Sequence, residues 1–211
     1  ADSPVVVRGD SQGVLGIWRD GNLGAKPELV QTDGGQLSAI RPALLAGRYL
    51  VIVTGQRTAS VWDLTSSAHK LGEWATAGVT YHSAAWQGPV ALIGNLRGEV
   101  QRIDLANPDR PEVRSPLTIR EKNAVTALAA TADLVVAGGP RDRLVLFDSA
   151  GVALPDFQAP GPVSSLDVSE DGTEILMGST TSTALLLEVS GATLRTIREF
   201  PLESGAHAVT H

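Results

Sequence analysis

The stretch from Arg57 to Leu64, RTASVWDL, is a short alternating apolar run that ends in Trp62 and Asp63. Four other stretches carry a related phrase, namely GVLGIWRD, GEVQRIDL, DRLVLFDS and STALLLEV. The residues in the Trp position of the five phrases are Trp18, Trp62, Ile103, Phe147 and Leu187. They recur at intervals of about 40 to 45 residues, so the chain is predicted to be an array of repeated units of short strands.

A second set of segments aligns independently of this phrase. LSAIRPAL, VTYHSAAW, VTALAATA and VSSLDVSE begin at Leu37, Val79, Val125 and Val163. A period of this length built from short strands is typical of β-propeller blades. The two alignments together predict an all-β fold, a single β-propeller domain over 1–211 with about five four-stranded blades.

The first blade is expected to combine the two ends of the chain. Residues 1–32 supply three strands, and VTH from Val209 repeats the start of an opening strand. We assign blade 1 to 1–32 plus 205–211, blade 2 to 33–76, blade 3 to 77–119, blade 4 to 120–160 and blade 5 to 161–204. A C-terminal strand at Ala206–His211 would close the ring by pairing into blade 1, since closure leaves no unpaired sheet edge. The alternative is a fragment of a longer repeat array.

Composition excludes several classes of function. The net charge of −6 argues against nucleic-acid binding, which needs a basic surface. No apolar run approaches the roughly 20 residues of a membrane helix, so no membrane partner is expected. The chain has no cysteine, which excludes disulfides and thiolate chemistry. We expect a cytoplasmic protein, with secretion left open.

The chain resembles the WD-repeat β-propellers over essentially its whole length. The resemblance rests on Trp62-Asp63, on the opening strands LSAI, VTAL and VSSL, on the SEDG hairpin and on the strand LVVAGG. The segment LANPDRPEVRSPLTIREKNAV also resembles blade junctions of bacterial WD-repeat arrays fused to signalling ATPases or proteases. The chain departs from the family in two respects. It lacks the Gly-His dipeptide before its four complete first strands, and it lacks the family's Asp in the turn that precedes the Trp position.

The resemblance implies a rigid disc whose loop faces bind another protein. The family's turn Asp is replaced at the turns between second and third strands, and the residues at or beside it are Gln12, Gln56, Arg57, Arg97 and Arg141. Three arginines at equivalent turns would make a positive arc that steers an acidic protein or peptide. The alternative is that these arginines are merely solvated, or paired with Asp142 or Glu99.

Other repeated residues are expected to be structural. The apolar residues in the Trp position should pack between blades, and the acids that follow should accept hydrogen bonds from turn amides. These structural residues are Trp18, Trp62, Asp63, Asp104, Phe147 and Asp148.

The sequence supplies no catalytic or metal-binding constellation, so we expect no enzyme, no cofactor and no metal. His82 aligns with apolar residues of other first strands and is expected to be packed. His207 and His211 would lie about 13 Å apart on a strand, too far for one metal ion. Asp167 and Arg41 lie on innermost strands and would sooner form an ion pair than an acid/base couple.

The predicted function is a non-catalytic WD-repeat-like interaction scaffold or sensor module, within a bacterial signalling or defence protein. The alternative is a five-bladed carbohydrate-binding or carbohydrate-active propeller. That alternative requires carboxylates and exposed aromatic residues clustered at the mouth of the central channel.

Overall fold

Short alternating apolar runs form antiparallel strands along the whole described chain. The structure, a computed structural model, describes residues 5–10, 12–32, 37–42, 48–54, 58–75, 78–119, 123–169, 171–191 and 193–202; for Asp20, for 37–42 and for Thr54 it describes the backbone alone. Within these ranges the only helix is the short 3-10 turn η1 (Arg19–Gly21), and no helix is long and apolar enough to cross a membrane. The prediction of an all-β fold is confirmed.

The described strands form five antiparallel sheets, named A to E in chain order. Sheet A has three strands, β1 (Val6–Gly9), β2 (Val14–Trp18) and β3 (Glu28–Gln31). Sheet B has β4 (Leu37–Pro42), β5 (Tyr49–Thr54), β6 (Thr58–Asp63) and β7 (His69–Ala75). Sheet C has β8 (Tyr81–Gln87), β9 (Val90–Asn95), β10 (Glu99–Asp104) and β11 (Glu112–Thr118). Sheet D has β12 (Ala127–Ala130), β13 (Leu134–Gly138), β14 (Arg143–Asp148) and β15 (Phe157–Gln158), and sheet E has β16 (Val163–Val168), β17 (Glu174–Ser179), β18 (Thr183–Ser190) and β19 (Thr193–Pro201).

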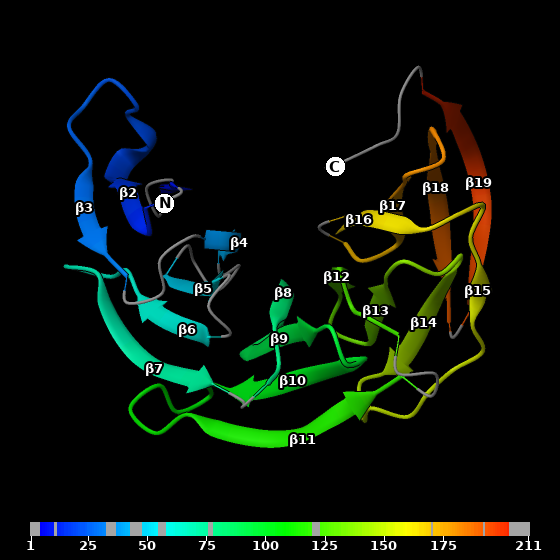
Figure 1. Cartoon of the computed structure of the whole chain (residues 1–211), viewed down its shortest axis with the longest axis horizontal. Helices are drawn as coiled ribbons and strands as arrows, with labels where there is room; N and C mark the ends of the chain where they lie inside the picture. Colours follow the sequence, from blue (N-terminus) through cyan, green and yellow to red (C-terminus); the bar gives the residue numbers. More distant parts are fainter. Residues whose placement is uncertain are drawn as a thin grey trace.

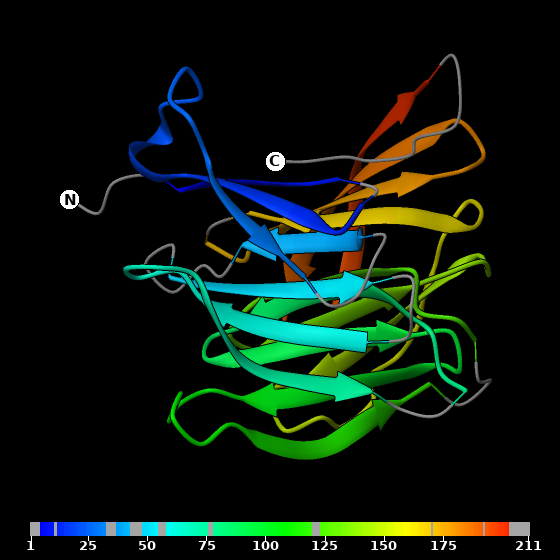
Figure 2. The same cartoon turned by 60° about the vertical axis from the view of Figure 1, so that its left-hand side comes forward.

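The sheets follow one another around an arc in the order of the sequence (Figure 1). Each four-stranded sheet has its first strand at the inside of the arc, where β4 contacts β8, β8 contacts β12 and β12 contacts β16. Turned to the side, successive sheets lie face to face in a stack (Figure 2). Consecutive units along the chain are therefore direct neighbours in space.

The hydrophobic core lies between the sheets, in four clusters that each join two successive sheets. Strand β14 shows how the sequence produces this arrangement, because successive side chains of a strand point to opposite faces. Val145 and Phe147 lie in the cluster between sheets C and D, whereas Leu144 and Leu146 lie in the cluster between D and E. Both faces of an inner sheet are buried, which requires apolar residues at consecutive positions.

The residue in the Trp position of the repeat faces the preceding sheet. Trp62, Ile103, Phe147 and Leu187 are each buried in the cluster between their own sheet and the one before it. Trp18 has the same position in sheet A, which no sheet precedes within the described ranges, and its side chain is half-buried. The repeated phrase thus supplies one half of a sheet–sheet contact.

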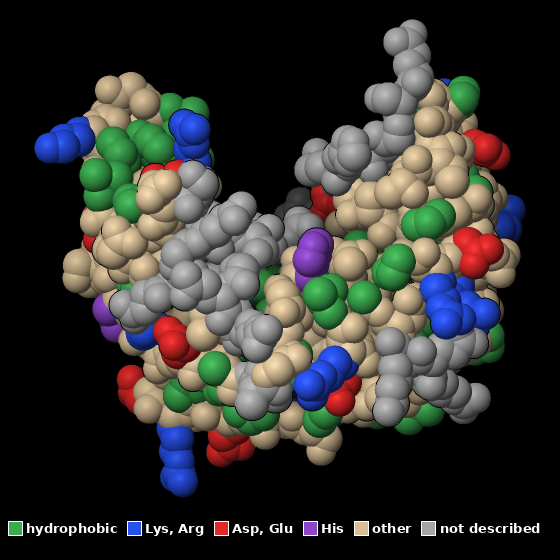
Figure 3. Space-filling model, viewed as in Figure 1, with side chains coloured by type: hydrophobic (Ala, Val, Ile, Leu, Met, Phe, Trp, Pro, Cys, Tyr) green, Lys and Arg blue, Asp and Glu red, His purple; other side chains and the backbone are tan. Residues whose placement is uncertain are grey.

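The sheets form an open arc and not the closed ring that the sequence predicts. Sheets A and E stand at its two ends, with a hollow between them in the space-filling view (Figure 3). Among the described strands none of sheet E pairs with sheet A, and sheet A has three strands with β1 at its inner edge. The predicted closing strand, Ala206–His211, lies outside the described residues. Closure is therefore wrong for the described chain, because sheets A and E each pack on a single neighbour.

The packing of the Trp position gives a stability prediction. Trp62 is 6% exposed and its indole N–H donates to Ser60 Oγ at 2.9 Å. Trp62→Ala should lower the free energy of unfolding by about 3–5 kcal/mol, the usual loss for a buried tryptophan, measured by urea denaturation. Trp18→Ala is the matched control and should lose clearly less, because that ring is only half-buried. Equal losses in the two variants would show that packing between sheets does not determine the contribution of this position.

Candidate protein-interaction face

In sheets C, D and E the turns between the second and third strands lie at one end of the strands, and the turn between β1 and β2 of sheet A corresponds to them. Their main chains contact the segment that enters the next sheet: Val125 N–H donates to the Asn95 carbonyl at 2.9 Å, and Val163 N–H donates to the Gly139 carbonyl at 2.8 Å. We call the surface formed by 12–13, 95–98, 139–142 and 180–182 the turn face. It is continuous across sheets C, D and E, and the turn of sheet A has the same position in its own sheet.

Three of the five predicted partner-binding residues are described, and all three are exposed on the turn face. Gln12 lies on the turn of sheet A, Arg97 on that of sheet C and Arg141 on that of sheet D. Gln56 and Arg57 lie outside the described residues. The structure therefore places the described members on equivalent turns of three sheets.

The turn of sheet C is held by a buried side chain. Asn95 Oδ1 accepts hydrogen bonds from the N–H groups of Arg97 at 2.8 Å and Glu99 at 3.1 Å, and Asn95 Nδ2 donates to a Glu99 carboxylate oxygen at 3.1 Å. Gly98 has a φ of 82°, which an L side chain rarely adopts. Leu96 and Arg97 therefore project from a turn whose backbone is fixed.

Equivalent hydrogen bonds hold the turns of the first and last sheets. Asp10 Oδ1 accepts from the N–H groups of Gln12 at 2.8 Å and Val14 at 2.9 Å. Ser179, which is fully buried, accepts from Thr181 N–H at 3.2 Å. A turn that is already ordered loses little conformational entropy when a partner binds, so this construction favours recognition by the turn tips.

A pocket opens beside the turn face between sheets C and D, with a volume of about 540 Å³. Its walls come from the end of β11, from β14 and from the segment before β15. The lining residues are Thr118, Ile119, Asn123, Arg143, Val145, Ala153, Leu154, Pro155 and Asp156. Ile119 N–H donates to the Gly98 carbonyl at 2.8 Å, so the pocket wall is tied to the turn that carries Arg97.

The pocket exists because the fourth strand of sheet D is interrupted. The sequence predicts a strand over Val152–Phe157, but β15 has 2 residues where β7 and β11 have 7 and β19 has 9. Pro155 has no N–H to donate to β14, and a proline is rarely tolerated inside a paired strand. Pairing with β14 stops after Leu154, whose N–H donates to the Leu146 carbonyl at 2.9 Å, and resumes at Phe157. The proline in the predicted strand was the signal that could have revealed the pocket.

The pocket combines apolar walls with one ion pair. Ile119, Val145 and Leu154 supply apolar surface, while Arg143 and Asp156 form an ion pair at 3.1 Å. Asp156 is the only carboxylate among the lining residues, and no aromatic residue lines the pocket. A volume of about 300 to 1,000 Å³ is common for ligand pockets, so one or two partner side chains could enter it.

The acids at the ends of the third strands accept hydrogen bonds from the turns that follow. Asp63 accepts from Thr65 N–H, Asp104 from Ala106 N–H and Asp148 from Val152 N–H, each at 2.8 Å. Two of the three acids also pair with an arginine: Asp63 with Arg48 at 2.7 Å and Asp104 with Arg114. These acids lie at the opposite end of the strands from the turn face.

Burial and hydrogen bonding shift the pKa values of two carboxyls. Burial alone raises the pKa of Asp63, but the hydrogen bonds from Arg48 and Thr65 outweigh it and lower that pKa to about 2. The pKa of Asp171 is also lowered to about 2, because it accepts from the Thr173 N–H and from the Ser169 and Thr173 hydroxyls in an exposed hairpin. Both carboxylates stay ionised at neutral pH, so neither is a general acid there.

Neither histidines nor acids form a reactive cluster within the described ranges. No group of three or more His, Asp or Glu residues there could hold a metal ion. His82 is exposed on β8, in contrast to the packed position predicted for it. His207 and His211 lie outside the described residues, and the side chain of Arg41 is not described, so its predicted ion pair with Asp167 stays a prediction.

Charges on the visible face of the molecule are mixed. Basic and acidic side chains lie interspersed in the space-filling view, and apolar side chains are scattered between them (Figure 3). Comparison with protein-family models and with curated proteins finds no match to this chain. The functional conclusion therefore depends on the site and on the repeat pattern of the sequence.

The shifted pKa of Asp63 predicts how stability depends on pH. Its folded value of about 2 lies below the ordinary value of 3.8, so the ionised carboxylate stabilises the fold above about pH 4 and loses this effect as the pH falls toward 2. Because Arg48 is half-exposed, the contribution is about 1–2 kcal/mol. Asp63→Asn should lose it at neutral pH and show a flatter decline in acid, measured by urea denaturation at successive pH values.

Asp133→Asn, at an exposed turn, is the control for this measurement and should follow the wild type. An Asp63→Asn variant with the same acid decline as the wild type would show that the Arg48–Asp63 pair does not contribute to stability.

Proposed function

We propose that the chain is a non-catalytic, WD-repeat-like interaction module that binds another protein or peptide through the turn face. The observation that carries the proposal is the pairing of fixed turns with exposed tips: Arg97 and Arg141 project from ordered backbone on two neighbouring sheets. A rigid surface with varied residues at equivalent points suits one asymmetric partner. The role of scaffold or sensor in a bacterial signalling or defence protein rests on the resemblance of its repeats.

The propeller architecture belongs to the same proposal. The period of about 40–45 residues and the face-to-face order of sheets A to E around an arc both favour it. The repeated Trp position, which faces the preceding sheet in sheets B to E, supports a shared repeat design. Because the two ends of the arc do not meet, the number of blades in a complete propeller is left open.

The junction of sheets C and D is the proposed centre of the binding surface. Leu96 is 43% exposed at the tip of its turn, next to Arg97, and the Gly98 carbonyl of the same turn accepts from Ile119 N–H in the pocket wall. Apolar side chains and arginines are frequent anchors at protein interfaces. An apolar partner residue would enter the pocket, while acidic partner residues would meet Arg97 and Arg141.

The carbohydrate alternative has weaker support. Sugar sites commonly combine carboxylates with exposed aromatic faces, whereas the described pocket has one carboxylate, already paired with Arg143, and no aromatic lining residue. Trp86 is buried against Tyr49, with ring centroids 6.5 Å apart. Trp74 lies over Gly72 on the outer strand β7 and does not recur in the other sheets.

Charge reversal of the arginine arc tests the proposal. The triple variant Arg57→Glu, Arg97→Glu and Arg141→Glu should associate about ten-fold more slowly with a polyglutamate peptide at low salt, because the positive arc no longer steers it. Stopped-flow measurement at several ionic strengths should show a much weaker salt dependence than in the wild type. The peptide stands in for an acidic partner.

The matched control reverses three basic residues near the opposite end of the sheets: Lys26→Glu and Arg110→Glu, between β2 and β3 and between β10 and β11, and Arg195→Glu, near the start of β19. It changes the net charge by the same amount and should retain most of the association rate. Equal slowing in the two triple variants would show that net charge alone governs the encounter, and the turn face would lose its role.

A further inference from the structure

Two arginines lie side by side on the face of sheet C that looks toward sheet D. Arg102 on β10 and Arg114 on β11 are paired directly opposite each other, so their side chains share one face. Val100, two residues before Arg102, is buried in the cluster between C and D, which shows where that face points. Like charges directly opposite each other destabilise a sheet, so the arrangement requires counter-charges.

Arg114 has an acidic partner, whereas Arg102 has none among the described residues. Arg114 pairs with Asp104. The Nε–H of Arg102 donates to the Ser115 carbonyl at 2.8 Å, and its two terminal NH2 groups meet no acceptor in the described part of the chain. Arg102 is half-buried, and burial together with the neighbouring Arg114 lowers its pKa. An anion would therefore stabilise this guanidinium, which is partly removed from water and next to a second cation.

The guanidinium of Arg102 reaches the turn of sheet D that leads to the pocket between C and D. Gly151 in this turn has a φ of 89°, and a Cβ on it would lie 3.1 Å from Arg102 Nη1 and 2.8 Å from Leu117 Cδ2. Thr118, the residue after Leu117, lines the pocket. Ala153, two residues after Gly151, also lines it. The unpaired end of Arg102 and the pocket are thus carried by neighbouring residues on both sheets.

The same seam supplies apolar surface. Ile119, Val145 and Leu154 line the pocket, and Val152 in the adjoining turn is 60% exposed. The carboxylate in the pocket lining, Asp156, is already paired with an arginine at 3.1 Å. An apolar group with a carboxylate beside it would match this site in both parts. The apolar group would lose contact with water, and the carboxylate would accept two parallel hydrogen bonds from the guanidinium.

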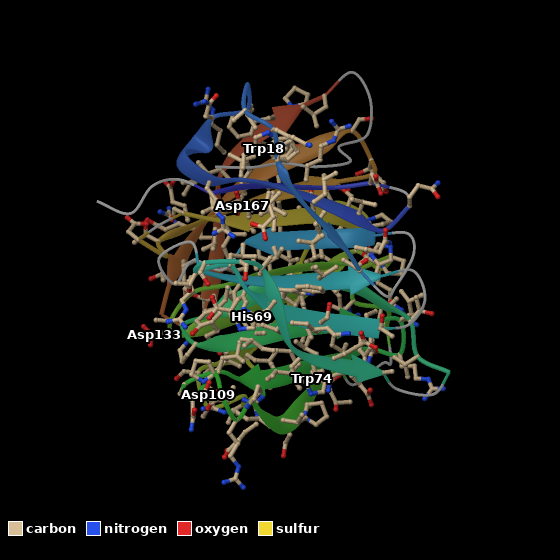
Figure 4. All side chains as sticks on the ribbon, turned by 90° about the vertical axis from the view of Figure 1, so that its left-hand side faces the viewer. Trp18, His69, Trp74, Asp109, Asp133 and Asp167 are labelled. Carbon is tan, nitrogen blue, oxygen red and sulfur yellow. The ribbon has the colours of Figure 1, made fainter. Side chains whose placement is uncertain are left out.

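We propose that the pocket and Arg102 together bind a segment of a partner protein in which an apolar residue stands next to an acidic one. The apolar side chain occupies the pocket, and the carboxylate pairs with the terminal NH2 groups of Arg102. This inference rests on the proposed function, since it takes the pocket as the seat of a partner's apolar residue. It adds a contact away from the turn face, toward the end of sheet C where Figure 4 labels Asp109 in the loop between β10 and β11.

Two capped hexapeptides test the pairing. One has Leu-Glu at its centre, flanked by glycine and serine, and the other has Leu-Gln in its place. The wild type should bind the Leu-Glu peptide about ten-fold more tightly, because only a carboxylate forms charge-assisted hydrogen bonds with Arg102. Arg102→Gln should bind both peptides equally. Binding is measured by two-dimensional NMR titration, in which the amide signals of Gly151 and Ala153 should shift.

Three further variants separate the parts of the site. Arg110→Gln is the matched control, because it removes the same charge from the exposed loop after β10, and it should keep the preference for the Leu-Glu peptide. Arg102→Lys keeps the charge but not the planar fork and should keep part of the preference, which excludes misfolding as the cause of the loss in Arg102→Gln. Ala153→Phe fills the pocket and should weaken the binding of both peptides.

Two results would overturn the inference: a Leu-Glu peptide that does not bind at its solubility limit, and a preference for it that is unchanged in Arg102→Gln. A preference that disappears instead in the triple variant Arg57→Glu, Arg97→Glu and Arg141→Glu would also overturn it, since the carboxylate then meets the turn face. The proposed function fails separately. It depends on the association rate of that triple variant with polyglutamate, which a loss of the Arg102 contact leaves unchanged.

Discussion

The structure depends on burying apolar side chains between successive sheets. A sheet of three or four short strands has no core of its own, so each inner sheet needs a neighbour on both faces. The sequence meets this requirement with consecutive apolar residues, as in β14, where Val145 contacts one cluster and Leu146 the other. Within the described chain, the two sheets at the ends of the arc, A and E, each have a neighbouring sheet on one face only.

Polar contacts at the seams fix how closely neighbouring sheets approach. Ser83 is buried and its Oγ donates to the Val125 carbonyl at 3.0 Å. A Cβ on Gly94 would lie 2.3 Å from Ser83 Oγ. The main chain of sheet C thus comes against the segment entering sheet D without an intervening side chain. Because Asn95 accepts from Val125 at the same seam, the packing of the sheets also positions the turn that carries Arg97.

A second seam lies on the outer side of sheets A and B. Arg19 donates to the Leu64 carbonyl and to Glu28, and Glu28 accepts from Ala68 N–H at 3.0 Å. Burial alone raises the pKa of Glu28, but the hydrogen bonds from Ala68 and Arg19 outweigh it and lower the pKa below its usual range. The carboxylate therefore joins the two sheets in its ionised form.

The sequence predicts the parts of this fold that repeat and misses the parts that occur once. The spacing of Trp18, Trp62 and Phe147 predicts the strand order of the sheets, because burial between sheets acts on every unit alike. The pocket arises from Pro155, a single break in one edge strand, and no period can show it. The open arc was missed because closure depends on long-range contacts between chain ends, which local pattern does not encode.

The residues that vary between units differ from those that persist, and this contrast supports the proposed binding surface. Residues in the Trp position change identity but remain apolar, since each must fill the space against a neighbouring sheet. Gln12 and Arg97 occupy turns whose N–H groups are held by Asp10 and Asn95, and Arg141 occupies the equivalent turn of sheet D. Positions that the fold leaves unconstrained, on backbone that it holds rigid, are those where a recognition surface can vary without loss of stability.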